Sequence, residues 1–299
     1  MVCTAVSRFS PTWLRGAALM ASLLGASPAA WAAPRLPPAG PPPPPPGAHW
    51  VPAPALTDGF DGRRLNLAKW QPRHPYWAGR EPSRFAPANV SVGNGQLRLR
   101  STPVTAAGPA AVADPQTDVW VSAACVASRA PIAGPGYYEA RLKASHLPMT
   151  SSFWLQGRFS EIDVVEQIGA STVNPAQGGF MLMNTHYFAD GWVHDKATPQ
   201  RWRMATGAAD AYHVYGVWWK DTRTLWFYCD GVKVASVTTG GAFTEPMWLF
   251  FDTEVFRWEG LPTVSALSDP ARNTMKVDWV RAWRLALSSA PRRPERPRR

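Results

Sequence analysis

The sequence predicts an all-β fold, a jelly-roll sandwich of two curved antiparallel sheets with an open cleft on the concave face. Short runs of alternating apolar and polar residues, bounded by Gly, Pro, Asn and Asp, fill the central part of the chain. No long stretch has a helical period, and no segment repeats at a fixed interval. Asn94-Gly95 and Asp230-Gly231 each divide two alternating runs, which is the signal of a tight β-hairpin.

The alternating runs define the expected strands in chain order. The first hairpin covers residues 88–100, and further strands are expected at 136–144, 213–219 and 225–237. Three longer stretches have no regular period, at 69–88, 167–179 and 187–210. Long loops in a compact domain are usually functional, so these three are expected to wall the cleft.

The first 32 residues have the pattern of an export signal. Arg8 and Arg15 precede an apolar run at 17–26, and Ala30-Trp31-Ala32 offers a small-x-small cleavage site. The run is too short to span a bilayer, and no other segment is apolar enough to do so. A secreted protein, extracellular or periplasmic, is therefore expected.

Residues 33–49 and 286–299 are expected to lie outside the folded domain. The first segment contains six consecutive prolines, Pro41–Pro46, which favour an extended polyproline linker. The second is rich in Pro and Arg and is expected to form a disordered basic tail. The domain itself is expected to span 50–285.

The formal charge of +10 suggests a nucleic acid or another polyanion as partner until the charge is divided by region. Residues 1–47 and 291–299 hold eight arginines and one glutamate. Without them, 23 basic and 20 acidic residues leave a net charge of +3. The central domain is close to neutral, so no nucleic-acid partner is expected.

Cys125 and Cys229 are the cysteines that remain once the signal is removed. In an oxidising compartment they could form one disulfide. Both lie in strand-like apolar runs, so two separately buried thiols are an equal alternative.

Residues 160–169, S-E-I-D-V-V-E-Q-I-G, place three carboxylates in an apolar, β-branched strand. Glu161 and Asp163 share one face because residues two apart point the same way. Glu166 joins them only if a β-bulge absorbs one residue among Val164 and Val165. Three like charges on one short strand are a poor choice for stability, which favours catalytic carboxylates over a solvated polar face.

This stretch resembles the E-x-D-x-x-E signature of glycoside hydrolase family 16, in the bulged form found in agarases, porphyranases, κ-carrageenases and laminarinases. The resemblance covers roughly residues 50–285. Further motifs resemble the family in their order: W-A-G-R at 77–80, the hairpin at 89–99, G-Y-Y-E-A-R-L-K at 136–143, F-W-L at 153–155, F-Y-C-D-G at 227–231 and K-V-D-W-V-R-A-W at 276–283.

The resemblance implies a retaining mechanism, with Glu161 as nucleophile, Glu166 as acid/base and Asp163 between them. Retention requires the two working carboxyl groups to be about 5 to 5.5 Å apart. Bulging and curvature of the strand are expected to bring them together.

The family also implies residues that contact the sugar. Trp154 matches the platform beside the scissile bond, although alternation sends either it or Phe153 into the core. Trp77 and Arg80 match a loop of the agarase and porphyranase branches, where the Trp stacks on galactose and the Arg binds a hydroxyl or a sulfate; a loop pinned by its own Trp would have the same sequence. Three more candidates follow: His186, which is otherwise a structural hydrogen bonder, and Glu254 and Trp258 at the cleft edge.

The resemblance therefore implies a secreted endo-hydrolase of a β-linked galactan such as agar or porphyran. A β-1,3-glucanase comes second, because the Trp-Pro and Gly of laminarinases are replaced by residues 156–160 here. A non-catalytic polysaccharide-binding module on the same fold and a transglycosylase also stay open. The chemistry needs no cofactor, and no Cys/His spacing indicates a metal. A structural calcium ion occurs in many relatives, but no acidic loop here requires one. A monomer is expected.

Overall fold

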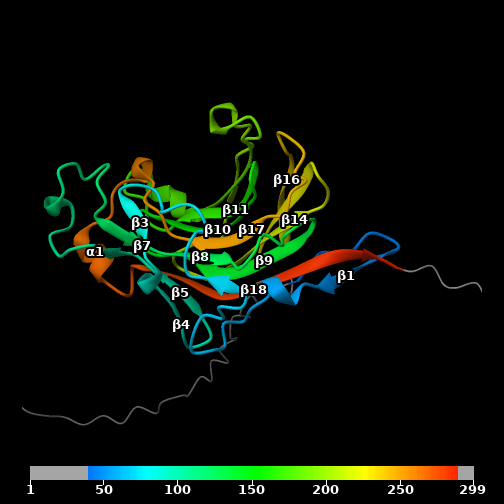
Figure 1. The fold of residues 1–299 in the computed structure, drawn as a ribbon, viewed down its shortest axis with the longest axis horizontal. Helices are drawn as coiled ribbons and strands as arrows, with labels where there is room; N and C mark the ends of the chain where they lie inside the picture. The colour runs from blue at the N-terminus through cyan, green and yellow to red at the C-terminus, as the bar shows by residue number, and fades with distance from the viewer. Residues whose placement is uncertain (1–39, 289–299) are drawn as a thin grey trace, which may run out of the picture. The chain divides into compact units, whose positions relative to one another are not determined.

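The computed structural model describes residues 40–288, and these form two curved antiparallel sheets packed face to face. Figure 1 shows them as layers, with β10, β11 and β17 above β9 and β18. The predicted all-β sandwich is confirmed. The expected signal peptide at 1–32, most of the linker at 33–49 and most of the tail at 286–299 lie outside the described residues.

The outer sheet has eight strands and holds both predicted hairpins. Asn94, Gly95, Asp230 and Gly231 all have positive φ angles, as tight hairpin turns require. Seven of its strands follow the order β16-β15-β14-β9-β18-β5-β4, and β1 pairs with β18. Their bounds are β1 Ala48–Pro52, β4 Val90–Val92, β5 Leu97–Arg100, β9 Gly136–Lys143, β14 His213–Trp219, β15 Thr224–Cys229, β16 Val232–Thr238 and β18 Thr274–Leu287.

The pairing of β1 with β18 extends the folded part slightly beyond the predicted limits. Ala48 lies opposite Leu287. The paired strands therefore extend two residues beyond each of the expected domain limits, 50 and 285. The backbone amide of Gly40 also donates to Glu139 of β9 at 3.0 Å. The last residues of the predicted linker therefore lie against the outer sheet and do not form a free spacer.

The inner sheet has seven strands in the order β13-β12-β11-β10-β17-β8-β2. Its bounds are β2 Trp70–Gln71, β8 Cys125–Ser128, β10 Thr150–Gln156, β11 Ser160–Ile168, β12 Phe180–Tyr187, β13 Gln200–Arg203 and β17 Trp248–Asp252. A third sheet joins β3 (Ser83–Phe85), β7 (Val121–Ala123) and β6 (Thr102–Pro103). The helical elements are short: α1 (Val264–Ser268), η1 (Pro54–Leu56), η2 (Pro87–Asn89), η3 (Gly108–Ala111), η4 (Pro175–Gly179), η5 (Trp192–His194) and η6 (Arg257–Glu259).

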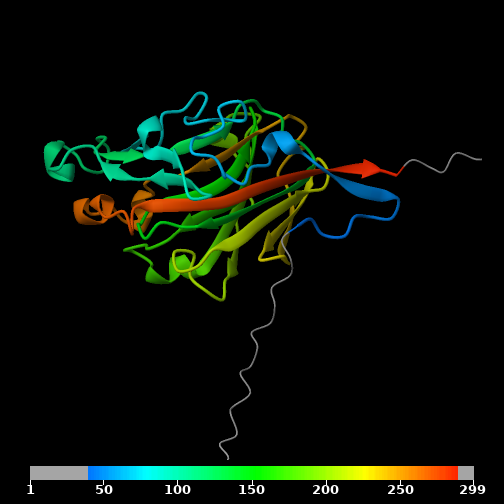
Figure 2. The same cartoon turned by 90° about the horizontal axis from the view of Figure 1, so that it is seen from below.

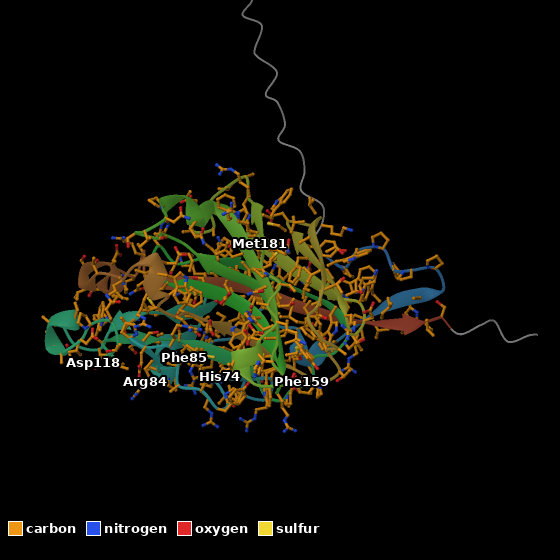
Figure 3. The ribbon with its side chains drawn as sticks, turned by 90° about the horizontal axis from the view of Figure 1, so that it is seen from above. His74, Arg84, Phe85, Asp118, Phe159 and Met181 are labelled. Atoms are coloured by element: carbon orange, nitrogen blue, oxygen red, sulfur yellow. The ribbon has the colours of Figure 1, made fainter. Side chains whose placement is uncertain are left out.

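The three stretches predicted as irregular are only partly so. Residues 69–88 include β2 and β3, and residues 187–210 include β13, which adds an edge strand to the inner sheet. Apolar alternation did not reveal these strands because they are very short or, in β13, exposed at every residue. Figure 3 shows His74, Arg84, Phe85 and Phe159 along one side of the domain and Met181 toward the other.

The main core lies between the two large sheets, where the inward-facing side chains of their strands pack together. Phe153, Leu155 and Phe251 of the inner sheet meet Tyr215, Val217 and Phe227 of the outer sheet in one cluster. The other face of the inner sheet is therefore free to carry polar side chains.

Cys125 and Cys229 are both buried and both free. Cys125 packs with Trp154 and Phe250 on the cleft side of the inner sheet, whereas Cys229 lies in the main core. The observed arrangement is therefore that of two separately buried thiols, without a disulfide between them.

Candidate active site

Strand β11 carries its three acids on one face because it contains the predicted β-bulge. Phe153 and Trp154 are consecutive in β10, yet they pair with Val165 and Asp163 of β11. Val164, between these two, is therefore left without a partner in β10. Val164 and Val165 are both buried in the main core. Because of this extra residue, the side chain of Glu166 points to the same face of the strand as those of Glu161 and Asp163. All three acids line the same cavity.

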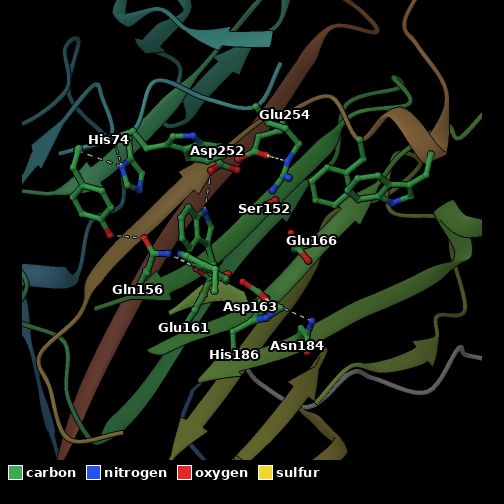
Figure 4. Close-up of a pocket in the computed structure, with 17 residues that line it drawn as sticks. His74, Ser152, Gln156, Glu161, Asp163, Glu166, Asn184, His186, Asp252 and Glu254 are labelled. Atoms are coloured by element: carbon green, nitrogen blue, oxygen red, sulfur yellow. Dashed lines mark hydrogen bonds and ion pairs between the residues drawn. The ribbon is translucent and has the colours of Figure 1, made fainter. Parts of the chain in front are cut away.

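The cavity has a volume of about 670 Å³ and lies on the face of the inner sheet that is turned away from the main core (Figure 4). It gathers all nine residues that the sequence singled out: Glu161, Asp163, Glu166, Trp77, Arg80, Trp154, His186, Glu254 and Trp258. Segments from both halves of the domain contribute, since Trp77 and Trp258 are far apart in the chain. Eight further residues line it without having been predicted: His74, Tyr76, Ser152, Gln156, Asn184, Trp192, Asp252 and Phe256.

The strand register decides which side chain lies beside each acid. Directly opposite residues on one face of an antiparallel pair have Cβ atoms about 4.5 to 5.5 Å apart. The two strands that flank β11 therefore provide each acid with specific neighbours: Gln156 and His186 beside Glu161, Trp154 and Asn184 beside Asp163, and Ser152 beside Glu166.

Glu161 is held by a chain of two hydrogen bonds. Gln156 donates from Nε2 to Oε2 of Glu161 at 2.5 Å. The Tyr76 hydroxyl donates to Oε1 of Gln156, which fixes the orientation of the amide. Gln156 therefore presents its NH₂ group to the carboxylate and favours the ionised form of Glu161.

His186 links the acid strand to the loop that follows β12. Its Nδ1 lies 2.6 Å from Oδ2 of Asp195, and its Nε2 lies 3.4 Å from Oδ2 of Asp163. The Asn184 amide lies 2.9 Å from the same Nε2, and its own Oδ1 accepts from the backbone amides of Thr185 and Thr198. Asn184 is thereby oriented with its NH₂ group toward Nε2 of His186, while Nδ1 of the imidazole contacts Asp195.

All three acids of β11 have raised pKa values. Burial raises the pKa of Glu161 well above its usual range, and the adjacent Asp163 raises it further, against the opposing effect of His186. Burial, then Glu166, raises the pKa of Asp163 well above its usual range. Burial also raises the pKa of Glu166, while His186 and Arg80 oppose that shift. Burial and the mutual repulsion of the carboxyl groups therefore favour their protonated forms more than in isolated carboxyl groups.

Trp154 faces the cavity, as predicted, and Phe153 faces the core. The indole stacks on Phe250, with ring centroids 4.3 Å apart, and its Nε1 donates to Asp252 at 3.0 Å. His74 stacks on the same Phe250 at 4.6 Å, and burial lowers the pKa of His74 to about 4. A neutral imidazole therefore packs next to the indole and adds no charge to the cavity.

Arg80 lies at the centre of an aromatic cluster at one end of the cavity. Its Nε donates to Oε2 of Glu254 at 2.8 Å. Its guanidinium carbon lies 5.8 Å from the ring centroid of Trp77, 5.0 Å from Phe256 and 5.9 Å from Trp258. Burial raises the pKa of Glu254 to about 7, although Arg80 opposes the shift. The loop at 77–80 and the segment at 254–258 therefore form one wall together.

Two groups of side chains in the described residues bring metal-ligating atoms within 4.8 Å of one another. One is Glu161, Asp163 and His186, and the other is His213, Cys229 and Asp230. Each contains an imidazole, and the second also contains a thiol, whereas calcium prefers oxygen ligands. Neither group suits a structural calcium ion.

The family model for the GH16 domain of β-porphyranases A to D matches residues 50–285. The chain belongs to glycoside hydrolase family 16. The resemblance inferred from the acid strand and the motifs around it is thereby confirmed, and the protein is a glycoside hydrolase.

Similar proteins come from Zobellia galactanivorans and Phocaeicola plebeius. A β-porphyranase E of Zobellia galactanivorans is 34% identical over 258 residues, covering 80% of this chain and 89% of the relative. A β-porphyranase B of Phocaeicola plebeius is 35% identical over 276 residues, covering 80% and 86%. The crystal structure of the β-porphyranase BpGH16B from Bacteroides plebeius matches with a TM-score of 0.72 at 32% identity, covering 83% of this chain and 96% of that one.

Three of the unpredicted cavity residues of this family 16 enzyme show what a local sequence pattern could and could not have indicated. Ser152 and Gln156 lie two positions before and after Trp154 in β10, so all three point to the same face. The two-residue period of this strand could therefore have identified Ser152 and Gln156 as cavity residues. Asp252 ends β17, almost 100 residues after Trp154, and no local pattern indicates that these strands pair.

Proposed function

We propose that this protein is a secreted, retaining endo-hydrolase of a porphyran-type galactan. One observation carries the mechanism: the bulge at Val164 places Glu161 and Glu166 on one face, in a cavity with aromatic walls. The names of the family model and of the relatives support the galactan, and the pattern of residues 1–32 supports export. Within the described residues, no helix has the length and apolar character needed to cross a membrane.

In the proposed first step, Oε of Glu161 attacks the anomeric carbon while Glu166 donates its proton to the departing glycosidic oxygen. The C–O bond to the leaving chain breaks, and a covalent glycosyl-enzyme forms. In the second step, Glu166 removes a proton from water, the water oxygen attacks the same carbon, and Glu161 leaves. No cofactor takes part in either step.

The raised pKa of Glu166 fits the role of proton donor, whereas burial and Asp163 raise the pKa of Glu161 against its role as nucleophile. Glu166 must be protonated at the start, and burial raises its pKa. Glu161 must be ionised, and the hydrogen bond from Gln156 favours that form. Burial and Glu166 raise the pKa of Asp163, and a neutral Asp163 between the two working acids would repel an ionised Glu161 less than a carboxylate does.

Arg80 supports a sulfated substrate. Among residues 40–288, the Arg80 guanidinium forms its hydrogen bond through Nε, to Glu254. Its two terminal amino groups are therefore left to contact an anionic group. Its side chain is 45% exposed in the cavity wall. A guanidinium binds a sulfate through two parallel hydrogen bonds, and the surrounding Trp rings can stack on a galactose face.

Neutral agarose is the second candidate, and the charge of the cavity favours it. Five carboxyl groups line the cavity, from Glu161, Asp163, Glu166, Asp252 and Glu254, against the single guanidinium of Arg80. Ionised carboxylates would repel a densely sulfated chain.

Release of reducing ends from purified porphyran, agarose and a β-1,3-glucan tests the proposal, with Glu161→Gln as control. We expect wild-type cleavage of porphyran, loss of turnover in the variant, and first products that retain the β configuration by NMR. Cleavage of agarose alone would establish the second candidate. Cleavage of the glucan alone, or products of inverted configuration, would refute the proposal.

A further inference from the structure

The face of the outer sheet that is turned away from the cleft carries an unusual row of cations. Leu99, Leu142 and Met275 point into the main core. Their neighbours Arg98, Lys143 and Lys276 therefore point outward, by the alternation of a strand. Figure 2 views this side of the domain, with β18 running along it.

These three residues lie side by side across three adjacent strands. Lys276 of β18 is directly opposite Lys143 of β9 on one side and directly opposite Arg98 of β5 on the other. Like charges directly opposite one another destabilise a sheet. We call Arg98, Lys143 and Lys276 the cation row.

The partners of the row do not neutralise it. Lys143 donates to a backbone carbonyl, that of Asp210, at 3.3 Å. Nε of Arg98 is buried and has no hydrogen-bond partner in the described part of the chain. The nearby carboxylate, Asp278, is bonded to Arg141 at 2.6 Å. Among residues 40–288, the three positive charges are therefore left uncompensated.

Further cations on the same face lie over aromatic rings. Arg141 lies over Tyr212 at 4.5 Å from the ring centroid, and Arg281 lies over Trp279 at 4.1 Å. Glu139 also faces outward, directly opposite Arg281, and accepts a hydrogen bond from the backbone amide of Gly40. This face is thus strongly basic in a domain whose net charge is only +3, while the acids gather in the cleft on the opposite side.

We propose that the cation row is a non-catalytic binding site for the sulfate groups of a galactan chain. Three strands span about 10 Å across the row, so an extended polyanion lying across them meets three cations in succession. Lysine ammonium and arginine guanidinium groups both bind sulfate oxygens through charge-assisted hydrogen bonds. Bound there, the polymer holds the enzyme on its surface while the cleft on the other side remains free. The proposal rests on the sulfated galactan of the proposed function, but it involves none of the catalytic residues.

The test compares two triple variants of the full chain, each also carrying Glu161→Gln so that no polymer is cleaved. The row variant is Arg98→Gln, Lys143→Gln, Lys276→Gln. The matched control, Arg63→Gln, Arg64→Gln, Arg129→Gln, removes the same charge from exposed arginines outside the row. Retardation in gels that contain porphyran or agarose, and retardation of DNA, measure binding at low and high salt.

We expect the row variant to bind porphyran about tenfold more weakly at low salt, since each exposed charge contact contributes modestly. The difference should shrink at high salt, agarose retardation should be unchanged, and the control should behave as the parent. With Glu161 intact, the row variant should lose kcat/KM on the polymer but not on a short oligosaccharide. Its Tm should equal or exceed that of the parent, because a repulsion is removed.

Equal porphyran binding by row variant and parent, equal loss in the control, or a fall in Tm would each overturn the proposal. Loss of DNA retardation with porphyran retardation intact would make the row a nucleic-acid surface. If wild type cleaves no galactan but the row variant still loses porphyran binding, the proposed function fails and the row stands.

Discussion

Gln156 lies directly opposite Glu161 and donates a hydrogen bond to its carboxylate at 2.5 Å. The amide is oriented by the Tyr76 hydroxyl, which approaches from a loop 80 residues earlier. A neutral donor that favours the ionised form of a buried carboxylate suits a nucleophile better than an acid.

Replacing Gln156 with Leu should therefore raise the pKa of Glu161. Because Glu161 attacks as the carboxylate, the acidic limb of kcat/KM should move to higher pH, and kcat should fall about 10- to 100-fold, the range for a hydrogen bond to a charged group. Tyr76→Phe should produce the same shift to a smaller extent, since the amide remains. A pH–rate profile in which neither variant moves the acidic limb would exclude this positioning role.

Glu166→Gln should separate polymer from activated substrates. Glu166 is needed as a proton donor, and burial raises its pKa, so wild-type activity should decline on the alkaline side as this proton is lost. The variant should lose at least about 100-fold on polymer, while formation of the glycosyl-enzyme from an aryl glycoside with a good leaving group should persist. Burst kinetics with the aryl glycoside measure this step, and an equal loss on both substrates would remove Glu166 from the role.

Asp163→Asn should be inactive but more stable at alkaline pH. The pKa of Asp163 is raised well above its usual range by burial and by Glu166, so the folded protein holds a proton that the unfolded chain releases. The stability from this group is full below the unfolded pKa and is lost as pH rises. The amide cannot ionise, so its Tm should exceed that of wild type near pH 8, and the gap should narrow as the pH falls toward the unfolded pKa of about 4.

Thermal scans across this pH range provide the measurement. A variant that melts below wild type at every pH would mean that hydrogen bonds of the carboxyl group outweigh its cost of ionisation. Ser91→Ala, at an exposed position outside the cavity lining, is a suitable reference for handling differences between preparations.

The sequence predicted much of this site because its signals are local. For Glu161, Asp163 and Glu166 to lie on one face, the strand needed a bulge at Val164 or Val165. The bulge lies at Val164. Alternation assigned one of Phe153 and Trp154 to the core, and Phe153 is the one.

The remainder depends on strand register between distant segments. Asp252 reaches Trp154 because β17 pairs with β10, and His186 reaches Glu161 because β12 pairs with β11. The first pairing joins segments about 100 residues apart, and its register is set by packing of the whole sheet. The separate burial of Cys125 and Cys229, on opposite sides of the inner sheet, likewise requires the folded arrangement.

The last prediction concerns Trp77 and Arg80, which share one wall of the cavity. Trp77→Ala removes a ring that can stack on galactose, so kcat/KM should fall about equally on sulfated and neutral galactans. Arg80→Ala removes a charge-assisted contact, so porphyran cleavage should fall more than agarose cleavage, and the difference should shrink with salt.

Arg80→Lys distinguishes charge from geometry at this position. It keeps the positive charge but cannot form both the contact with Glu254 and a bidentate contact with sulfate. If the fork geometry matters, Arg80→Lys should resemble Arg80→Ala on porphyran. In Arg80→Ala, Glu254 is left buried without its partner, so its pKa should rise above about 7 and Glu254 should become neutral instead of repelling the substrate. Equal kinetics of wild type and both Arg80 variants on porphyran would show that Arg80 stabilises the wall and binds no sulfate.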